Sequence, residues 1–221
     1  MKYSLIFDFD STIIKSEILE NLASISLKDK PNKDEIILKI KEITNLGMEG
    51  KIPFSESLKR RISMLSITPQ ALDKVIKSSL NEISNSIKKN QSFFHQNSNN
   101  IYIISGGFKE VILPVAKYLG ISKSNVFANT FIPQGKYLGV DTNNPLAKDN
   151  GKVKVVQRLN LNPKNTLVIG DGMSDYAIKK SGLANYFIAF IENVKRNEVV
   201  LKADSVANNM QDVINYLKSI D

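Results

Sequence analysis

Two acidic residues stand one position apart at the end of the first apolar run, in the hexapeptide Phe7-Asp8-Phe9-Asp10-Ser11-Thr12. The apolar residues 5–7 just before them are typical of a buried strand. Aspartate, serine and threonine also form turns and helix N-caps, so a plain connection explains the hexapeptide as well as a reactive site does. The residues that come after the other strands must therefore decide whether Asp8 and Asp10 do chemistry.

Polar groups that suit one chemistry come directly after two later apolar runs, residues 101–104 and 167–169. Lys152 stands between these runs, at the start of a predicted helix over 151–159. Taken singly, a glycine pair is typical of a flexible turn and a lysine of a solvated surface. Because ligands bind where parallel strands end, the ordered set favours one shared site. The segments after the two runs are Ser105-Gly106-Gly107 and Gly170-Asp171-Gly172-Met173-Ser174-Asp175.

The carboxylates of this set suit phosphoryl transfer. Asp8 and Asp171 can supply oxygen ligands to a magnesium ion, which would offset the charge of a phosphoryl group. With that charge offset, a carboxylate can attack phosphorus and become an aspartyl phosphate. Asp10 lies on the same side of an extended chain as Asp8. Two close carboxylates divide their protonation, so one can be the nucleophile while the other carries a proton.

The remaining groups suit an anion. Ser105 and the amides of Gly106 and Gly107 come just before a predicted helix over 109–119, whose dipole favours a bound anion. Lys152 adds a positive charge for phosphoryl oxygens. The residues alone therefore predict a metal-binding carboxylate site that handles phosphate.

The elements that must position these groups alternate as strand, turn and helix. Residues 186–190 predict a fourth strand, and residues 175–181 and 211–220 predict two further helices. This alternation is typical of an α/β chain with a doubly wound, mostly parallel sheet. Residues 131–138 predict a small hairpin that turns at Gln134-Gly135.

A different composition separates the first two strands. Apolar residues recur there at helical spacing, without a convincing strand, over a length too great for one crossover. We therefore expect an α-helical cap domain at 15–81, inserted into a core formed by residues 1–14 and 82–221.

Composition restricts the metal and the partners. The 221 residues include no cysteine and one histidine, so thiolate and histidine-rich metal sites are excluded and an oxygen-held Mg²⁺ is expected.

The net charge of +8 fits lysine-rich solvated helices, and without a nucleic-acid motif we expect no nucleic-acid partner. No apolar run approaches membrane-spanning length, and a strand from Tyr3 leaves no room for a signal peptide. We expect a cytoplasmic monomer or homodimer with no membrane partner.

The strand-end motifs resemble those of the haloacid dehalogenase superfamily of aspartate-nucleophile phosphohydrolases. Its DxDx[TV] motif is similar to "DFDST" here, and "SGGF", the Gly-Lys pair at 151–152 and "GDGMSD" resemble its other three motifs. Within the superfamily, the segment 48–54, "MEGKIPF", resembles a cap motif of the phosphoserine phosphatase family. The resemblance spans nearly the whole chain. It implies a Rossmann-like core with a helical cap and a magnesium-dependent phosphatase of serine biosynthesis.

Carried over position by position, the resemblance implies Asp8 as the nucleophile and Asp10 as the general acid and base. It implies magnesium held by the side chains of Asp8 and Asp171 and the main-chain carbonyl of Asp10, with Asp175 supporting the site. The groups that would bind the phosphoryl end are Ser105, Gly106, Gly107, Lys152 and Ser174.

The resemblance also implies a subsite for the serine moiety of L-phosphoserine. Glu17 would bind its amine and Arg61 its carboxylate, and an arginine fork matches a carboxylate well. Met48 and Phe54 would close over the substrate. Ser174 departs from the Asn or Thr that many members carry, so we expect altered affinity but retained activity.

Other functions stay open on the sequence alone. The enzyme alternatives are a phosphatase for another small phosphomonoester, and transfer of the phosphoryl group from Asp8 to an alcohol other than water. The cap would set this choice, and one sequence constrains a cap poorly. A non-catalytic phosphate sensor or a basic nucleic-acid-binding module is the remaining class. A binder has no need of Asp10 as a proton donor, which favours an enzyme.

Overall fold

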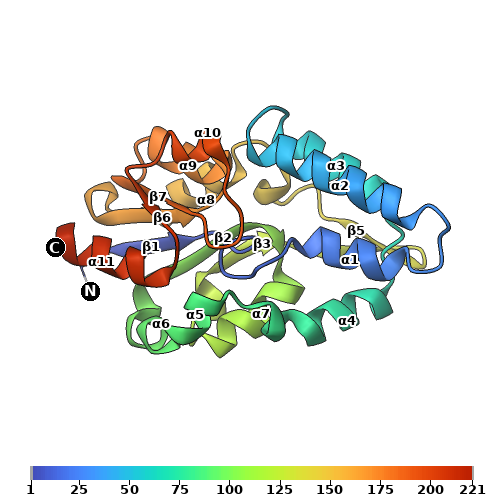
Figure 1. The fold of residues 1–221 in the computed structure, drawn as a ribbon, viewed down its shortest axis with the longest axis horizontal. Helices are drawn as coiled ribbons and strands as arrows, with labels where there is room; N and C mark the ends of the chain where they lie inside the picture. Colours follow the sequence, from blue (N-terminus) through green and yellow to red (C-terminus); the bar gives the residue numbers. More distant parts are fainter. Residues whose placement is uncertain (1, 221) are drawn as a thin grey trace.

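The computed structural model describes residues 2–220, which form one six-stranded parallel sheet and a separate two-stranded hairpin (Figure 1). From β1 the chain builds outward through β2 to β3, then returns to the other side of β1 and builds outward through β6, β7 and β8. The doubly wound α/β prediction is confirmed. Such a sheet binds ligands where its order reverses, which is here between β1 and β6. The strands are Ser4–Phe7 (β1), Ile101–Phe108 (β2), Val126–Asn129 (β3), Thr166–Gly170 (β6), Tyr186–Phe190 (β7) and Ser205–Ala207 (β8).

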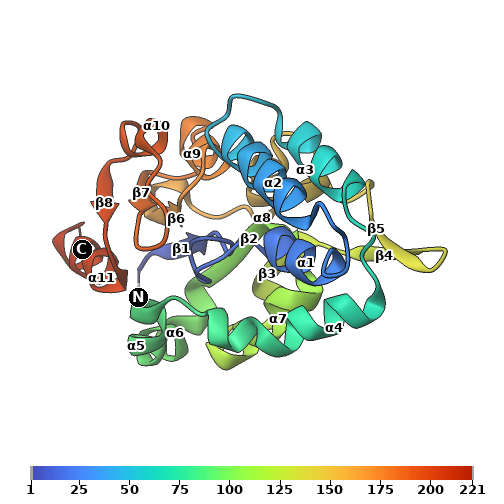
Figure 2. The same ribbon diagram turned by 45° about the vertical axis from the view of Figure 1, so that its right-hand side comes forward.

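Helices cover both faces of the sheet (Figure 2). Successive side chains of a strand point to opposite faces, so Leu5 and Phe7 pack with α5, α6, α7 and α11, whereas Ile6 packs with α8, α9 and α10. Both layers are apolar and buried, which explains why residues 5–7 of β1 form an unbroken apolar run. These helices are Asn85–Lys89 (α5), Gln91–Asn97 (α6), Lys109–Tyr118 (α7), Gly151–Leu159 (α8), Met173–Lys180 (α9), Asn197–Val200 (α10) and Met210–Ile220 (α11).

Four more helices lie between β1 and α5. They are Ile18–Ser26 (α1), Lys33–Met48 (α2), Phe54–Ser63 (α3) and Pro69–Ser78 (α4). The apolar spacing predicted three of them, α2, α3 and α4. Helices α1, α2 and α3 lie beyond the carboxyl end of β1 (Figure 1). Ala23 and Leu27 from α1 and its C-cap form a small apolar cluster with Ile40 of α2, and Met64 and Leu65, just after α3, pack against it. Among residues 2–220, no helix has both the length and the apolar character that a bilayer crossing needs.

The hairpin consists of Phe131–Gln134 (β4) and Tyr137–Val140 (β5). Its turn is at residues 135–136, one position later than predicted, because Gly135 supplies the positive φ of 61° that the tight turn needs. Leu138 N also donates to the Ile67 carbonyl, which ties the hairpin to the chain before α4. Short 3-10 helices complete the fold at Ser79–Glu82, Ser98–Asn100, Lys123–Asn125, Pro145–Ala147 and Pro163–Asn165.

Strand β2 is longer than predicted. It continues through the Ser105-Gly106-Gly107 segment to Phe108, where we expected a turn. Its pairing with β3 shifts register between Ile104 and Phe108. The amide of Gly107 donates to its own neighbour Ser105 Oγ at 2.9 Å, so the strand ends irregularly. The predicted anion-binding turn is therefore an extended segment that leads into α7.

Candidate active site

Eleven of the thirteen predicted site residues line one inner cavity of about 20 Å³. The cavity lies just beyond the carboxyl end of β1 and beside the last four residues of β2, and residues of α1 and α3 also line it. The other two, Asp171 and Asp175, stand beside it: Asp175 pairs with Lys152, and a carboxylate oxygen of Asp171 lies within 4.8 Å of one of Asp8, so the structure brings the whole set together. The eleven are Asp8, Asp10, Glu17, Met48, Phe54, Arg61, Ser105, Gly106, Gly107, Lys152 and Ser174.

Three aspartates form a buried acidic cluster. One carboxylate oxygen from each of Asp8, Asp171 and Asp175 lies within 4.8 Å of the other two. All three side chains are at most 2% exposed. Carboxylate oxygens at this spacing fit a hard divalent cation, which would also relieve the repulsion between the acids. The cluster is thus compatible with a divalent metal site.

Lys152 holds two of these acids. Its Nζ lies 2.8 Å from Asp8 Oδ2 and 2.8 Å from Asp175 Oδ1. Burial alone would lower the pKa of Lys152, but the charges of Asp175 and Asp8 outweigh it and raise the pKa above its ordinary value. Lys152 is therefore a permanent cation at the edge of the inner cavity, where it can attract an anionic ligand.

Arg196 holds the third acid and was not predicted. Its Nη1 lies 2.5 Å from Asp171 Oδ2, and both side chains are buried. Nearby, Asn193 Nδ2 donates to the carbonyl of Ser11 at 3.0 Å and to Ser84 Oγ at 2.7 Å. The segment before α10 thus supports the acidic cluster and the loop after β1. No motif or spacing marks this segment, so only its tertiary contacts reveal it.

The surroundings of Asp10 suit a carboxyl group that carries a proton. Burial, followed by the negative charges of Glu17 and Asp8, raises its pKa well above the ordinary value. Its Oδ1 accepts a hydrogen bond from Ile18 N at 2.7 Å, which fixes the carboxyl group at the start of α1. A Cβ on Gly107 would lie 2.5 Å from Asp10 Oδ2, so glycine is needed there. A raised pKa for Asp10 suits the proton-carrying role that the sequence leads us to expect of one of the two carboxyl groups.

Glu17 and Arg61 bring opposite charges to the same cavity. Both are buried, at 6% and 4% exposure. Glu17 Oε1 accepts a hydrogen bond from Ser11 Oγ at 2.7 Å. Arg61 donates to two neutral acceptors, the Ser57 carbonyl and Thr44 Oγ1, each at 3.3 Å. Burial lowers the pKa of Arg61, while Glu17 and Asp10 oppose that effect.

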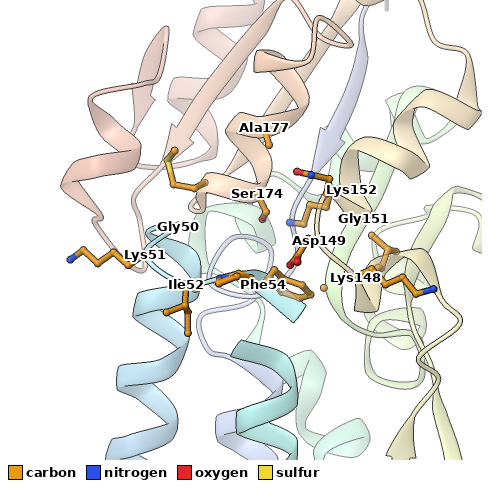
Figure 3. A pocket seen from close by; sticks show the side chains of 16 residues that line it. Gly50, Lys51, Ile52, Phe54, Lys148, Asp149, Gly151, Lys152, Ser174 and Ala177 are labelled. Atoms are coloured by element: carbon orange, nitrogen blue, oxygen red, sulfur yellow. The ribbon is translucent and has the colours of Figure 1, made fainter. Parts of the chain in front are cut away.

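A second cavity of about 350 Å³ opens beside the inner one (Figure 3). Phe54, Gly106, Lys152 and Ser174 line both cavities. The ring of Phe54 lies against Gly106, where any side chain would collide with it. Phe54 therefore separates the inner cavity from the wider one.

We expect Arg196→Ala to lower the free energy of unfolding of the metal-free protein by about 3 kcal/mol, because it leaves Asp171 buried without its cation. The melting temperature should fall by roughly 10 °C, whereas replacing the exposed Arg158 by alanine should change it by about 1 °C or less. Thermal unfolding of both variants checks this. Equal melting temperatures for Arg196→Ala and the parent would contradict it.

We also expect the metal-free protein to lose stability between about pH 5 and pH 8. Burial, followed by the charge of Asp8, raises the pKa of Asp175 to about 7, and burial raises the pKa values of Asp10 and Asp171 well above ordinary. The folded state therefore binds protons more tightly than the unfolded chain, and this stability is lost as the pH rises through about 7.

The measurement is the melting temperature against pH, with and without a divalent cation. We expect a fall on the order of 5 °C from pH 5 to pH 8 without metal. Because the cation binds the deprotonated carboxylates, it should stabilise more at pH 8 than at pH 5. A melting temperature that rises from pH 5 to pH 8 without metal would contradict the raised pKa values of Asp10, Asp171 and Asp175.

Comparisons with known proteins agree with this geometry. The sequence profile of the haloacid dehalogenase-like hydrolases matches residues 4–181. The chloroplastic phosphoserine phosphatase of Arabidopsis thaliana is 31% identical, over 96% of this chain and 70% of its own length. The phosphoserine phosphatase of Methanocaldococcus jannaschii is 28% identical, over 98% of each chain.

Solved structures agree as well. The crystal structure of a phosphoserine phosphohydrolase-like protein from Francisella tularensis is 32% identical, covers 97% of this chain and 99% of its own, and superposes with a TM-score of 0.86. A structure described as a phospho-aspartyl intermediate analogue of phosphoserine phosphatase is 25% identical, covers 97% and 98% of the two chains, and has a TM-score of 0.77. The chain belongs to the haloacid dehalogenase-like hydrolases and is a hydrolase of phosphoric monoesters.

Proposed function

We propose that this enzyme is a magnesium-dependent phosphoserine phosphatase that releases L-serine and phosphate. One observation carries the proposal: the buried Glu17 and Arg61 line the same small cavity as Asp8 and Asp10. A zwitterionic amino acid offers a cation to the first and an anion to the second. The relatives from Arabidopsis thaliana and Methanocaldococcus jannaschii are themselves phosphoserine phosphatases, which supports the same substrate.

In the proposed reaction, a carboxylate oxygen of Asp8 forms a bond to phosphorus and the ester P–O bond breaks. Asp10 gives its proton to the leaving serine oxygen, which suits its raised pKa. The ionised Asp10 then takes a proton from water as that water attacks the aspartyl phosphate. Phosphate leaves, and Asp8 and Asp10 return to their starting states.

The other residues bind and orient. Lys152 pairs with Asp8 and would also attract the phosphoryl oxygens, together with Ser105 Oγ and the Gly106 amide. Asp8, Asp171 and the main-chain carbonyl of Asp10 would hold Mg²⁺, with Asp175 in support. When bound, the ion supplies Lewis-acid stabilisation of phosphoryl charge. A known phospho-aspartyl intermediate analogue of a related phosphatase supports Asp8 as the nucleophile.

We also propose that residues 15–81 act as a cap on a core formed by residues 1–14 and 82–221. A small apolar cluster that joins α1, α2 and the residues just after α3 supports this division. Phe54 and Met48 would then exclude bulk water while the substrate is bound, and opening would admit water for the second step.

The test is phosphate release from L-phosphoserine with Mg²⁺, beside a panel of other small phosphomonoesters and an EDTA control. A strong preference for phosphoserine, lost on chelation and restored by Mg²⁺, is the expected result. Preference for another ester would keep Asp8 chemistry and discard the roles of Glu17 and Arg61. A phosphorylated product on adding homoserine would indicate phosphotransfer in place of hydrolysis.

A further inference from the structure

Asp149 contacts the first turn of α3 from a distant part of the chain. It lies in the loop before α8, and its Oδ1 accepts a hydrogen bond from Ser55 N at 2.9 Å across 94 positions of sequence. Pro53 is the N-cap residue of α3 and makes no side-chain cap hydrogen bond. The first amides of a helix have no partner inside the helix. Asp149 therefore performs for α3 the task of an N-cap side chain.

Helix α3 carries two side chains that the proposed catalysis depends on. Phe54, its first residue, separates the inner cavity from the wider one. Arg61, two turns later, lines the inner cavity. A helix moves as a stiff unit, so an anchor at its first turn positions both side chains together. Figure 3 shows Asp149 beside Phe54 in the wider cavity.

Two other contacts join this part of the chain to the opposite wall of the cavity, and both are apolar. We call residues 47–55 the lid segment. Within it, Phe54 lies against Gly106, and Gly50 lies beside Met173, whose side chain would be 3.4 Å from a Cβ at that position. Apolar contacts have no preferred direction, so they allow sliding. The Asp149 hydrogen bond has a direction, so it can fix the position that the lid segment takes when it closes over the cavity.

The same contact is easily broken. Asp149 is exposed and Ser55 is half-buried, so water competes for both partners. An N-cap contact changes an equilibrium by a modest factor, roughly fivefold. Such a contact favours closure over the substrate and still permits opening at each turnover.

We propose that Asp149 is a positioning residue that holds the lid segment and α3 closed over the catalytic cavity by capping the N-terminus of α3. It acts through Phe54 and Arg61, since Asp149 itself does not line the inner cavity that holds Asp8 and Asp10. The effect on phosphoserine rests on the proposed phosphatase function, whereas the effect on α3 does not.

The first test compares steady-state kinetics of three variants. Asp149→Ala should raise KM for phosphoserine about fivefold and change kcat less than about twofold. Asp149→Asn keeps a carbonyl acceptor and should restore KM to within about twofold. Asp141→Ala is the matched control, because Asp141 accepts from Asn143 N in its own loop and should leave KM unchanged. An unchanged KM in Asp149→Ala, or no recovery in Asp149→Asn, would overturn the proposal.

The second test needs no substrate. Amide hydrogen exchange of the peptide over residues 54–58 should be about fivefold faster in Asp149→Ala than in the parent, Asp149→Asn or Asp141→Ala. Exchange over 151–159 should be unchanged, which separates this role from support of α8. Unchanged exchange over 54–58 would overturn the proposal whatever the substrate. Faster exchange with preference for another ester would keep the role of Asp149 and reject phosphoserine.

Discussion

Asp8→Asn is expected to lower kcat for phosphomonoester hydrolysis by about 10⁴-fold or more while leaving the fold intact. An amide oxygen is a poor nucleophile towards phosphorus, and the other groups of the site have no second attacking atom in the same place. The change is nearly isosteric, and its oxygen can still accept from Phe9 N, as Asp8 Oδ1 does at 2.7 Å.

Stability supplies the control for this variant. The charge of Asp8 raises the pKa values of Asp10, Asp171 and Asp175, because the four acids repel one another. Removing that charge should leave the melting temperature of the metal-free protein equal to or above that of the parent. Turnover above about 1% of the parent rate would show that another residue attacks phosphorus.

Arg61→Ala is expected to raise KM for phosphoserine about 10²-fold and to change KM for p-nitrophenyl phosphate by less than about fivefold. The guanidinium is buried and its two contacts are neutral, so it can pair with a substrate carboxylate. p-Nitrophenyl phosphate has no carboxylate and gains nothing from it. The comparison uses kcat and KM for both substrates on each variant.

Arg60→Ala is the matched control for this experiment. Arg60 is the next residue along α3, is exposed, and pairs with Glu56 on the helix surface. Its loss should leave both KM values within about twofold. Any unfolded fraction of Arg61→Ala lowers the apparent kcat for both substrates equally. The ratio of the two KM values therefore reports the effect on substrate binding alone. Equal increases in KM for both substrates would rule out Arg61 as the carboxylate partner.

Much of the candidate site could be predicted because its chemistry sits at strand ends. An apolar run of three or four residues marks each of the strands β1, β2 and β6, and the parallel sheet brings the carboxyl ends of these strands to one edge. Residues such as Asp8, Ser105 and Asp171 therefore have to meet once the topology is correct. The short strands β3 and β8 were not predicted, because three or four residues of mixed polarity are too few to show the alternation of apolar and polar residues that marks a strand.

The sequence by itself determined the doubly wound sheet, the helical layer between β1 and α5, and the thirteen residues that gather at the cavity. The sheet and the helical layer come from local patterns, and the residues at the strand ends follow from one general rule of parallel sheets. Four others were expected from the family resemblance: Glu17, Met48, Phe54 and Arg61. Only the tertiary structure decided the role of Arg196 at Asp171, the hydrogen bonds of Asn193 to the loop after β1, and the contact of Asp149 with α3. These contacts join residues 25, 182 and 94 positions apart, and no local pattern records which distant partner a polar side chain will meet.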